Sequence, residues 1–507
     1  MFSNIESTLF ATGVPSIDMN RIRNIVHTAS RLSPIGRIAA RSESSETRTQ
    51  YFEQRESPSV LAIGGEHKPG LENVQGVRRP KSKGNQSDFI STCPTNQNPG
   101  QDMLRPSMVR VGGPLKSAKS KPGGYGQFGG RFVPEPLMGF LHELELAIEA
   151  ACSDPSFWTE YQAYQRAQPT PLLPAYNLTG LASGTDEYGS VATIWLKRDD
   201  ENEYGTHKTR NIVGQLLLAR RLGRRKIVTD CASAKHGIFT AKMCKQLELE
   251  CVITIGAADA LAQVDGIHAM VMLGARVLTA SPPSGNGTLR AAVNEAIRYL
   301  ASNHDTAYYL PGGPIGPAPL PDLNRIFQAL LGKEVMVQMD EAIGCRPDAL
   351  VAAVGSGSGA VGLFGPFVTD PLVRLVGVEG ADTAVLSAGS PGVLQGARTL
   401  VLQDHNGQIL DSHSISADMN ISTVGPEIAH WKTIGRMESV LATDAVARAG
   451  FRLLERYEGI RPGLDCSHAV ETTMRIAKEL GQGKHVVMLL TGDDSGKSIR
   501  SQLVREI

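Results

Sequence analysis

The feature that most constrains the fold is an alternation of short apolar runs and amphipathic stretches, which begins at Tyr125. Continuous apolar runs are typical of parallel strands buried on both faces, and the 3.6-residue periodicity between them predicts helices. Because the strands alternate with helices, the pattern favours parallel α/β sheets covered by helices on both faces. The predicted strands are 191–197, 226–230, 250–256, 275–280, 349–355, 372–380 and 485–492. The predicted helices are 211–223, 237–248, 261–274 and 289–303.

The first 122 residues differ in composition from the rest. Ser, Gly, Asn, Gln, Pro and charged residues predominate over most of this segment, and large apolar residues are few. Such a segment cannot bury enough apolar surface to offset the entropy lost on ordering it. We therefore predict a largely disordered extension over 1–122, with a short helix near 22–32. The core, 123–507, is large enough for two interleaved α/β subdomains with a ligand cleft between them, the smaller around 210–320.

Charge and cysteine content exclude several classes of protein. The 507 residues include 51 Lys and Arg and 51 Asp and Glu, and this balance argues against nucleic acid as a partner. No apolar run reaches the roughly 18 residues of a membrane helix, and no secretory signal is present. The seven cysteines form no CxxC pair, so we expect neither a disulfide framework nor a metal site. We expect a cytoplasmic protein. Five arginines between residues 19 and 42 leave an organellar transit peptide as the alternative.

Lys208 is the first candidate catalytic residue. It follows a Gly-Thr-His turn and opens the helix predicted over 211–223. The positive backbone potential at a helix N-terminus should lower the pKa of its amine, as a lysine that forms a Schiff base requires. Most lysines at helix starts are merely solvated, so this motif alone leaves both interpretations open.

Three further segments follow predicted strands, where ligands bind in open α/β sheets. The glycine-rich loop GSGSGAVG (355–362) can bind a phosphate through its N–H groups, although a closely packed turn explains it equally well. It matches neither the Walker pattern nor GxGxxG, so a phosphate monoester fits better than a dinucleotide. TDCASAKHG (229–237) could bind a carboxylate, although taken alone it is better explained as a structural strand-to-helix turn. Thr491 could point into a cleft. Together with a Schiff-base lysine, these features indicate pyridoxal phosphate acting on an amino acid.

Long motifs along most of the chain resemble those of the tryptophan synthase β family. They occur in the family's order, and they are YGQFGGRFVPEPLM (125–138), QPTPL (168–172), LKRDDENEYGTHK (196–208), GSGSGAVG (355–362), GVEG (377–380), LSAGSPGVLQG (386–396), VLQDHNGQILDSHSIS (401–416), VGPE (424–427) and EGIRPGLDCSHA (458–469). The resemblance implies the two-domain fold of type II pyridoxal-phosphate enzymes, with twisted parallel sheets and the cofactor in the interdomain cleft.

The resemblance also implies roles for individual residues. Lys208 matches the lysine that binds the cofactor and moves the α-proton, and Asp230 matches the catalytic glutamate that helps the β-hydroxyl leave. Thr491 matches a serine facing the pyridine nitrogen, and either hydroxyl can leave that nitrogen unprotonated. The other implied cofactor-binding residues are His207 beside the phosphate, Glu379 near the ring, and the cup Gly355, Ser356, Gly357, Ser358 and Gly359. The implied substrate-binding residues are Cys231, Ala232, Ser233, Ala234, Lys235, His236 and Asn420.

The departures from the family pattern gather around the amino acid and its nucleophile. Asp230 is one methylene shorter than glutamate, and a misplacement of about 1 Å can cost on the order of a hundredfold in rate. Lys235 and Asn420 stand where the family has Gln and Asp, and Arg210 replaces a small polar or apolar residue. Drift in a tryptophan synthase and retuning for another substrate both remain open.

The leading hypothesis is a pyridoxal-phosphate-dependent carbon–oxygen lyase that converts L-serine and indole to L-tryptophan and water through an aminoacrylate. The alternatives are a paralogue with another nucleophile or amino acid in specialised biosynthesis, serine β-elimination to pyruvate and ammonia, and a non-catalytic partner that binds the cofactor. The resemblance implies a homodimer, with a separate α subunit and a monovalent cation as further candidates. An α-subunit barrel needs roughly 250 residues, so we expect none within the extension.

Overall fold

The computed structural model describes residues 123–165, 169–184, 190–202, 205–281 and 287–492. The predicted disordered extension and its short helix near 22–32 lie outside the described residues. Among the helices of the described part, none combines the length and the apolar character needed to cross a bilayer.

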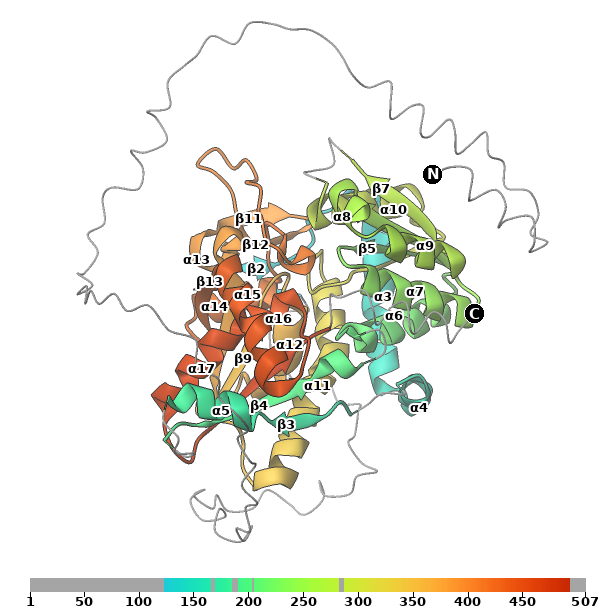
Figure 1. Cartoon of the computed structure of the whole chain (residues 1–507). Helices are drawn as coiled ribbons and strands as arrows, with labels where there is room; N and C mark the ends of the chain where they lie inside the picture. Colours follow the sequence, from blue (N-terminus) through green and yellow to red (C-terminus); the bar gives the residue numbers. More distant parts are fainter. Residues whose placement is uncertain (1–122, 166–168, 185–189, 203–204, 282–286, 493–507) are drawn as a thin grey trace, which may run out of the picture. The chain divides into compact units, whose positions relative to one another are not determined.

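The larger sheet has six strands, and all but one run parallel (Figure 1). In spatial order the parallel strands are β13 (Glu438–Ala442), β10 (Arg374–Gly380), β9 (Ala349–Ala353), β14 (His485–Leu490) and β4 (Thr193–Arg198). The edge strand β3 (Leu172–Pro174) pairs antiparallel with β4. Four of the parallel strands were predicted from their apolar runs, whereas β13 has two half-exposed and two exposed residues and was not.

The smaller sheet is parallel throughout and lies within the predicted smaller subdomain. Its strands, in spatial order, are β7 (Arg276–Ala280), β6 (Glu250–Gly256), β5 (Lys226–Cys231) and β8 (Ala307–Leu310). A third, antiparallel sheet was not predicted, because two of its strands have only two residues each and a third contains Gly and Pro. Its strands are β1 (Gly124–Tyr125), β2 (Phe128–Gly129), β12 (Ala397–Val401) and β11 (Ser390–Leu394). The subdomain boundaries stay a prediction.

Helices cover both faces of the larger sheet. Alternate residues of β9 enter different cores: Leu350 and Ala352 pack in one cluster, and Ala349 and Val351 in another. This confirms the predicted class of parallel sheets between helices. The helices are α3 (Pro136–Ser153), α4 (Pro155–Ala163), α5 (Tyr176–Ser183), α6 (Thr209–Arg221), α7 (Ala234–Gln246), α8 (Ala257–Ala262), α9 (Val264–Met272), α10 (Leu289–Ser302), α11 (Leu320–Ile343), α12 (Ser358–Phe364), α13 (Val385–Ala388), α14 (Pro426–Thr433), α15 (Asp444–Leu453), α16 (Leu464–Ser467) and α17 (Ala469–Leu480).

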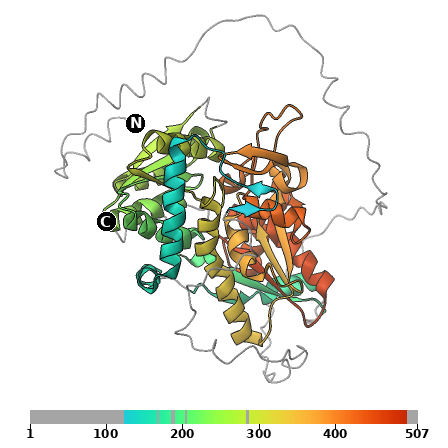
Figure 2. The ribbon, with the colours of Figure 1, turned by 180° about the vertical axis from the view of Figure 1, so that it is seen from behind.

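Two features of the helices bear on the site. The single helix predicted over 261–274 is wrong, because the chain leaves helical geometry at Gln263 and forms α8 and α9 instead. Helix α11 packs against both α6 and α12, and therefore connects the helix after Lys208 with the helix after the glycine loop (Figures 1 and 2).

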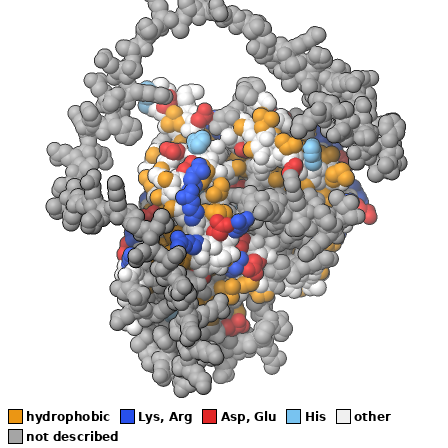
Figure 3. Space-filling view, in the orientation of Figure 1, with side chains coloured by type: hydrophobic (Ala, Val, Ile, Leu, Met, Phe, Trp, Pro, Cys, Tyr) orange, Lys and Arg blue, Asp and Glu red, His pale blue; other side chains and the backbone are white. Residues whose placement is uncertain are grey.

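On the face shown in Figure 3, basic and acidic side chains are interspersed.

Candidate active site

Three neighbouring strands of the larger sheet end at one edge. Strands β4, β14 and β9 are adjacent and parallel, so their carboxyl ends lie together, where open α/β sheets bind ligands. The chain after β4 leads to Lys208, the chain after β9 forms the loop Gly355–Gly359, and Thr491 directly follows β14. All three segments line one cavity, which we call the loop cavity. The structure thus brings together residues that the sequence assigned to the cofactor.

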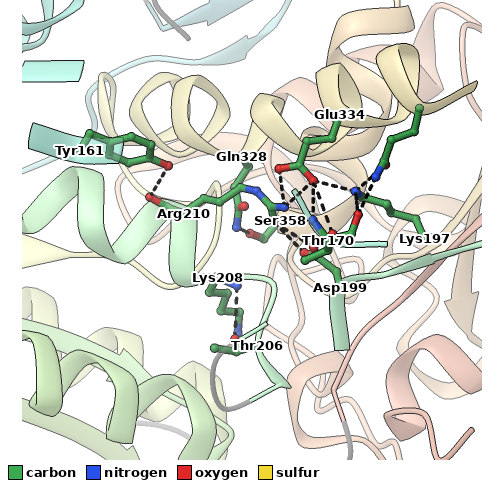
Figure 4. A network of polar contacts seen from close by, with 11 residues as sticks. Tyr161, Thr170, Lys197, Asp199, Thr206, Lys208, Arg210, Gln328, Glu334 and Ser358 are labelled. Atoms are coloured by element: carbon green, nitrogen blue, oxygen red, sulfur yellow. Dashed lines mark hydrogen bonds and ion pairs between the residues drawn. The ribbon is translucent and has the colours of Figure 1, made fainter. Parts of the chain in front are cut away.

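The backbone of the glycine loop requires glycine at two positions. Gly357 has a φ of 101°, in the left-handed region that side chains disfavour. A Cβ on Gly355 would lie 2.4 Å from the carbonyl oxygen of Asp418, so only glycine allows this approach. Gln328 of α11 donates a hydrogen bond of 2.9 Å to the hydroxyl of Ser358 and anchors the loop (Figure 4).

His207 provides the observation that fits a phosphate group. Its Nε2 is buried, has no hydrogen-bond partner among the described residues, and lies 4.0 Å from the position of a Cβ on Gly359. Burial, aided by the charge of Lys208, lowers the pKa of His207 to about 3, so the imidazole is neutral. A neutral imidazole can donate from Nε2, and a buried donor without a partner costs about 1–3 kcal/mol. A phosphate oxygen beside the loop would remove that cost, so these residues fit pyridoxal phosphate.

Lys208 lies in the loop cavity and is 8% exposed. Its Nζ donates a hydrogen bond of 2.8 Å to the carboxylate of Asp418, and its backbone N–H donates to the hydroxyl of Thr206. Burial is the largest single effect and favours the neutral amine, but the charge and hydrogen bond of Asp418, with smaller contributions from Asp230 and Cys231, together raise the pKa of Lys208. The lowered pKa predicted from the helix N-terminus is therefore wrong, because Asp418, a residue 210 positions away, decides the balance.

A buried cluster of four charges, which we call the anchor cluster, holds the start of α6 (Figure 4). Arg210 donates to both carboxylate oxygens of Asp199 at 2.9 Å, and to those of Glu334 at 2.8 and 3.0 Å. Lys197 donates to Glu334 at 2.6 Å. The two positive and two negative charges balance, so the cluster can be buried without a net charge. Sequence reasoning noted Arg210 as unusual but missed these partners.

Asp230, the predicted acid–base group, ends β5 and is 3% exposed. Its carboxylate accepts hydrogen bonds from the Tyr309 hydroxyl at 2.8 Å and from the Gly312 N–H at 3.2 Å. Burial raises the pKa of Asp230 despite these donors. Its carboxylate is thus bound on the side of β8, and the residue does not line the loop cavity. A catalytic role for Asp230 stays a prediction.

The turn after Asp230 is clamped by Gln263, which sequence reasoning missed. The Gln263 side chain accepts from the Ala234 N–H and donates to the Ala232 carbonyl, both at 2.7 Å. The Ala234 N–H is therefore not available to a substrate carboxylate. Gln263 lies at the break between α8 and α9, so the wrongly predicted single helix hid this contact.

A second cavity, which we call the turn cavity, adjoins the loop cavity. His207, Asp418, Asp465 and Thr491 line both. Of the predicted substrate-binding residues, Ser233 and Lys235 line the turn cavity. The side chains of two others are engaged within the fold, since Cys231 donates to the Ser233 carbonyl and His236 bonds the Thr229 hydroxyl at 2.9 Å.

Glu379 and Asn420 are also among the predicted residues that line neither cavity. The carboxylate of Glu379 accepts from the N–H of Leu386 and the hydroxyl of Ser387, at the start of α13. The side chain of Asn420 accepts from the hydroxyl of Ser412 at 3.0 Å. Both side chains therefore have hydrogen-bond partners within the fold, and their predicted contacts with cofactor and substrate stay predictions.

Two carboxylates that the sequence did not single out line both cavities instead. Asp465 of α16 accepts a hydrogen bond of 2.7 Å from the Thr491 hydroxyl. Asp418, in the 3₁₀ segment η6 (Ala417–Met419), is the partner of Lys208. Asp465 belongs to a motif that supports the family resemblance, whereas Asp418 does not. The contacts of both join distant segments and have no local signal.

Comparison with known proteins agrees with this geometry. Residues 164–492 match the family model of pyridoxal-phosphate dependent enzymes. The chain is 43% identical over 389 residues to the tryptophan synthase beta chain of Allorhizobium ampelinum, covering 75% of this chain and 94% of that one. It is 41% identical over 381 residues to the beta chain of Methylibium petroleiphilum, covering 73% and 90%. It is 42% identical over 379 residues to the tryptophan synthase of Saccharomyces cerevisiae, covering 73% of this chain but only 52% of the yeast protein. The chain belongs to the pyridoxal-phosphate dependent enzyme family, and it is a tryptophan synthase β-like member of that family.

Proposed function

We propose that the chain joins L-serine and indole to form L-tryptophan and water, as a carbon–oxygen lyase of amino-acid biosynthesis. The observation that carries this proposal is the convergence of Lys208, His207, Gly355–Gly359 and Thr491 on one cavity. The beta chains to which this chain is similar are named for the same activity. When bound, pyridoxal phosphate supplies the electron sink for bond breaking at the α- and β-carbons of an amino acid.

The residues of the site divide the remaining work. The N–H groups of Gly355–Gly359 and the Nε2 of His207 would hold the phosphate. Lys208 would bind the aldehyde and, once displaced by substrate, would take the proton from the α-carbon. Ser233 and Lys235 line the turn cavity and would bind the amino-acid carboxylate. Asp230 would act on the β-hydroxyl only if its carboxylate turned away from Tyr309.

Product analysis tests the proposal. The full chain is given pyridoxal phosphate, L-serine and indole, and the products are separated by chromatography and identified by mass. We expect tryptophan that depends on both substrates. Pyruvate and ammonia without an amino-acid product would replace the proposal with β-elimination, and no turnover of serine would contradict it.

A different nucleophile is the second candidate, and the lining of the turn cavity favours it. Indole is largely apolar and fits an apolar pocket, because pockets match the chemistry of their ligands. The turn cavity combines charged residues with the apolar residues Ala262, Ile415, Ala417 and Leu464. A polar nucleophile could bind to Lys235, Asp418 and Asp465 there. Repeating the assay with small thiols, amines and hydroxyl compounds would show a polar nucleophile as a new amino-acid product formed faster than tryptophan.

We further propose a cytoplasmic homodimer that receives indole from a separate α subunit and binds a monovalent cation through backbone oxygens. The name "beta chain" of the matched relatives supports a partner chain. Light scattering of the purified protein should give twice the chain mass of 54.3 kDa. A mass of one chain would contradict the homodimer.

A further inference from the structure

We propose that Asp418 controls the protonation state of Lys208, and thereby the rate at which the chain captures its cofactor. Asp418 is a positioning residue in this proposal, because it acts through the lysine. The proposal rests on Lys208 as the cofactor lysine, but not on which nucleophile the enzyme uses.

The geometry places one carboxylate directly on the reactive nitrogen. The Oδ1 of Asp418 lies 2.8 Å from the Nζ of Lys208, and both side chains line the loop cavity. The close approach between Gly355 and the Asp418 carbonyl seats the η6 segment on the glycine loop. The carboxylate is therefore held in place by the same loop that would bind the phosphate.

The other titratable groups near the pair compete weakly with Asp418. Those that act on Lys208 or Asp418 from the surrounding elements are His207 before α6, Asp230 and Cys231 at the end of β5, His236 in α7, and Asp259 in α8. Asp465 lines the same cavity but is bonded to Thr491. Burial lowers the pKa of both histidines to about 3 and raises that of the Cys231 thiol, so these three groups are neutral near pH 7.

The carboxylate itself is ionised. Burial, the largest single effect, would raise the pKa of Asp418, but the opposing contributions, of which the Lys208 ammonium is the largest, together lower the pKa to about 2. Asp230 carries the competing charge, but its carboxylate is bonded to Tyr309 and Gly312. Asp418 is therefore the anion that holds Lys208 as an ammonium ion.

Capture of the cofactor requires the neutral amine. Lys208 must first lose one proton to solvent. Its lone pair then attacks the aldehyde carbon of pyridoxal phosphate, a C=N bond forms, and the aldehyde oxygen leaves as water. The neutral fraction falls tenfold for each unit by which the pH lies below the amine pKa. Without the carboxylate, burial would favour the neutral form. During turnover the same pair would retain the proton that Lys208 takes from substrate.

The test measures cofactor loading without serine or indole. The full chain, freed of cofactor, is mixed with pyridoxal phosphate at pH values from about 6 to about 9, and the absorbance change of the cofactor is followed. We expect Asp418→Asn to load about tenfold faster than wild type at each pH in this range, because one pKa unit is a factor of ten. Equal loading rates would overturn the proposal.

Two variants serve as controls. Asp418→Glu keeps the negative charge and should load at close to the wild-type rate, whereas loading as fast as Asp418→Asn would contradict a role for the charge. Asp465→Asn removes a carboxylate from the same cavity, and its effect should be much smaller. An equal acceleration in both Asn variants would show a general field effect instead of the ion pair.

A second measurement does not depend on the variants folding. Lys208 of the cofactor-free wild-type chain is labelled with an amine-specific reagent over a series of pH values, and its peptide is quantified by mass spectrometry. The midpoint of the rise in reactivity should lie above the usual lysine pKa, and a midpoint below that value would overturn the proposal. Since neither experiment uses substrate, their failure is distinguishable from failure of the proposed reaction.

Discussion

Lys208 and Arg210 are two cations separated by one residue, yet their surroundings differ completely. Arg210 is 0% exposed and bonded to two carboxylates of the anchor cluster, which has no net charge. Lys208 has a single carboxylate partner, Asp418, whose side chain is 26% exposed, and both line a cavity. The anchor cluster fixes the start of α6, whereas Lys208, paired with Asp418 in the loop cavity, can exchange a proton with solvent or substrate.

The comparison shows how one turn of chain can be both rigid and reactive. Because Arg210 is guanidinium, it stays charged at all relevant pH values and its forked donors fix two carboxylates at once. Because Lys208 is an amine, its charge responds to its partner. Four substitutions or conditions should separate these two roles.

Replacing Lys208 should have the largest effect. Lys208→Ala should lower turnover by on the order of 10⁴-fold or more, because it removes both the cofactor bond and the base. It should reduce stability less than loss of Arg210, since Asp418 remains accessible to water. Initial-rate assays and urea denaturation measure the two effects. Substantial activity in this variant would remove Lys208 from the mechanism.

Replacing Arg210 should mainly affect stability. Arg210→Met leaves the carboxylate of Asp199 buried with fewer partners, and breaking a buried pair costs about 3–5 kcal/mol. Arg346→Met breaks an ion pair with Asp370 in which Arg346 is 55% exposed, and should cost less than about 1 kcal/mol. Urea denaturation compares the two free energies of unfolding, and equal losses would contradict the distinction between them.

The pH dependence of stability should report the neutral histidines beside Lys208. His236 has a pKa of about 3 in the folded chain, below its usual unfolded value, so the unfolded chain binds more protons between these values. Stability therefore falls as the pH drops, by about 1.4 kcal/mol for each such histidine between about pH 7.5 and about pH 5.5. His236→Gln should remove this share.

The contribution of His236 to the pH dependence of stability is the difference between wild type and His236→Gln. Burial raises the pKa of Asp259 and Glu427 to about 7, and these carboxyl groups act in the opposite direction. The surface variant His304→Asn is the matched control. If thermal unfolding of the cofactor-free His236→Gln chain changes with pH as wild type does, the buried histidine is not neutral.

The smallest effect should come from the clamp on the turn. Gln263→Ala frees the Ala234 N–H and the Ala232 carbonyl, and loss of these bonds should raise KM for serine by about fivefold, equivalent to about 1 kcal/mol. Gln403→Ala removes a glutamine whose partners are Ser390 and Pro391, and should leave KM unchanged. An unchanged KM in Gln263→Ala would show that the two hydrogen bonds of Gln263 do not affect serine binding.

The sequence predicted buried strands better than half-exposed or very short ones. Strand β6 matches the predicted range 250–256, because a buried parallel strand is apolar on both faces. Strand β13 and the antiparallel sheet were missed, since half-exposed or very short strands carry no such pattern. The two helices around Gln263 look like one because the break contains neither Gly nor Pro.

The site was predictable where function depends on local motifs. Lys208, His207, the glycine loop and Thr491 each end or follow a strand, and the sheet order brings them together. The partners that decide their charge were not predictable in the same way. Asp418 lies 210 residues from Lys208, and only the folded chain places its carboxylate on the amine.

The most direct test of the account is to identify the lysine that carries the cofactor. The full chain is loaded with pyridoxal phosphate and reduced with borohydride, and the labelled peptide is identified by mass spectrometry. The account predicts the label on Lys208, in the peptide that follows the Gly-Thr-His turn. A label on Lys235, the lysine that lines the turn cavity, would contradict it.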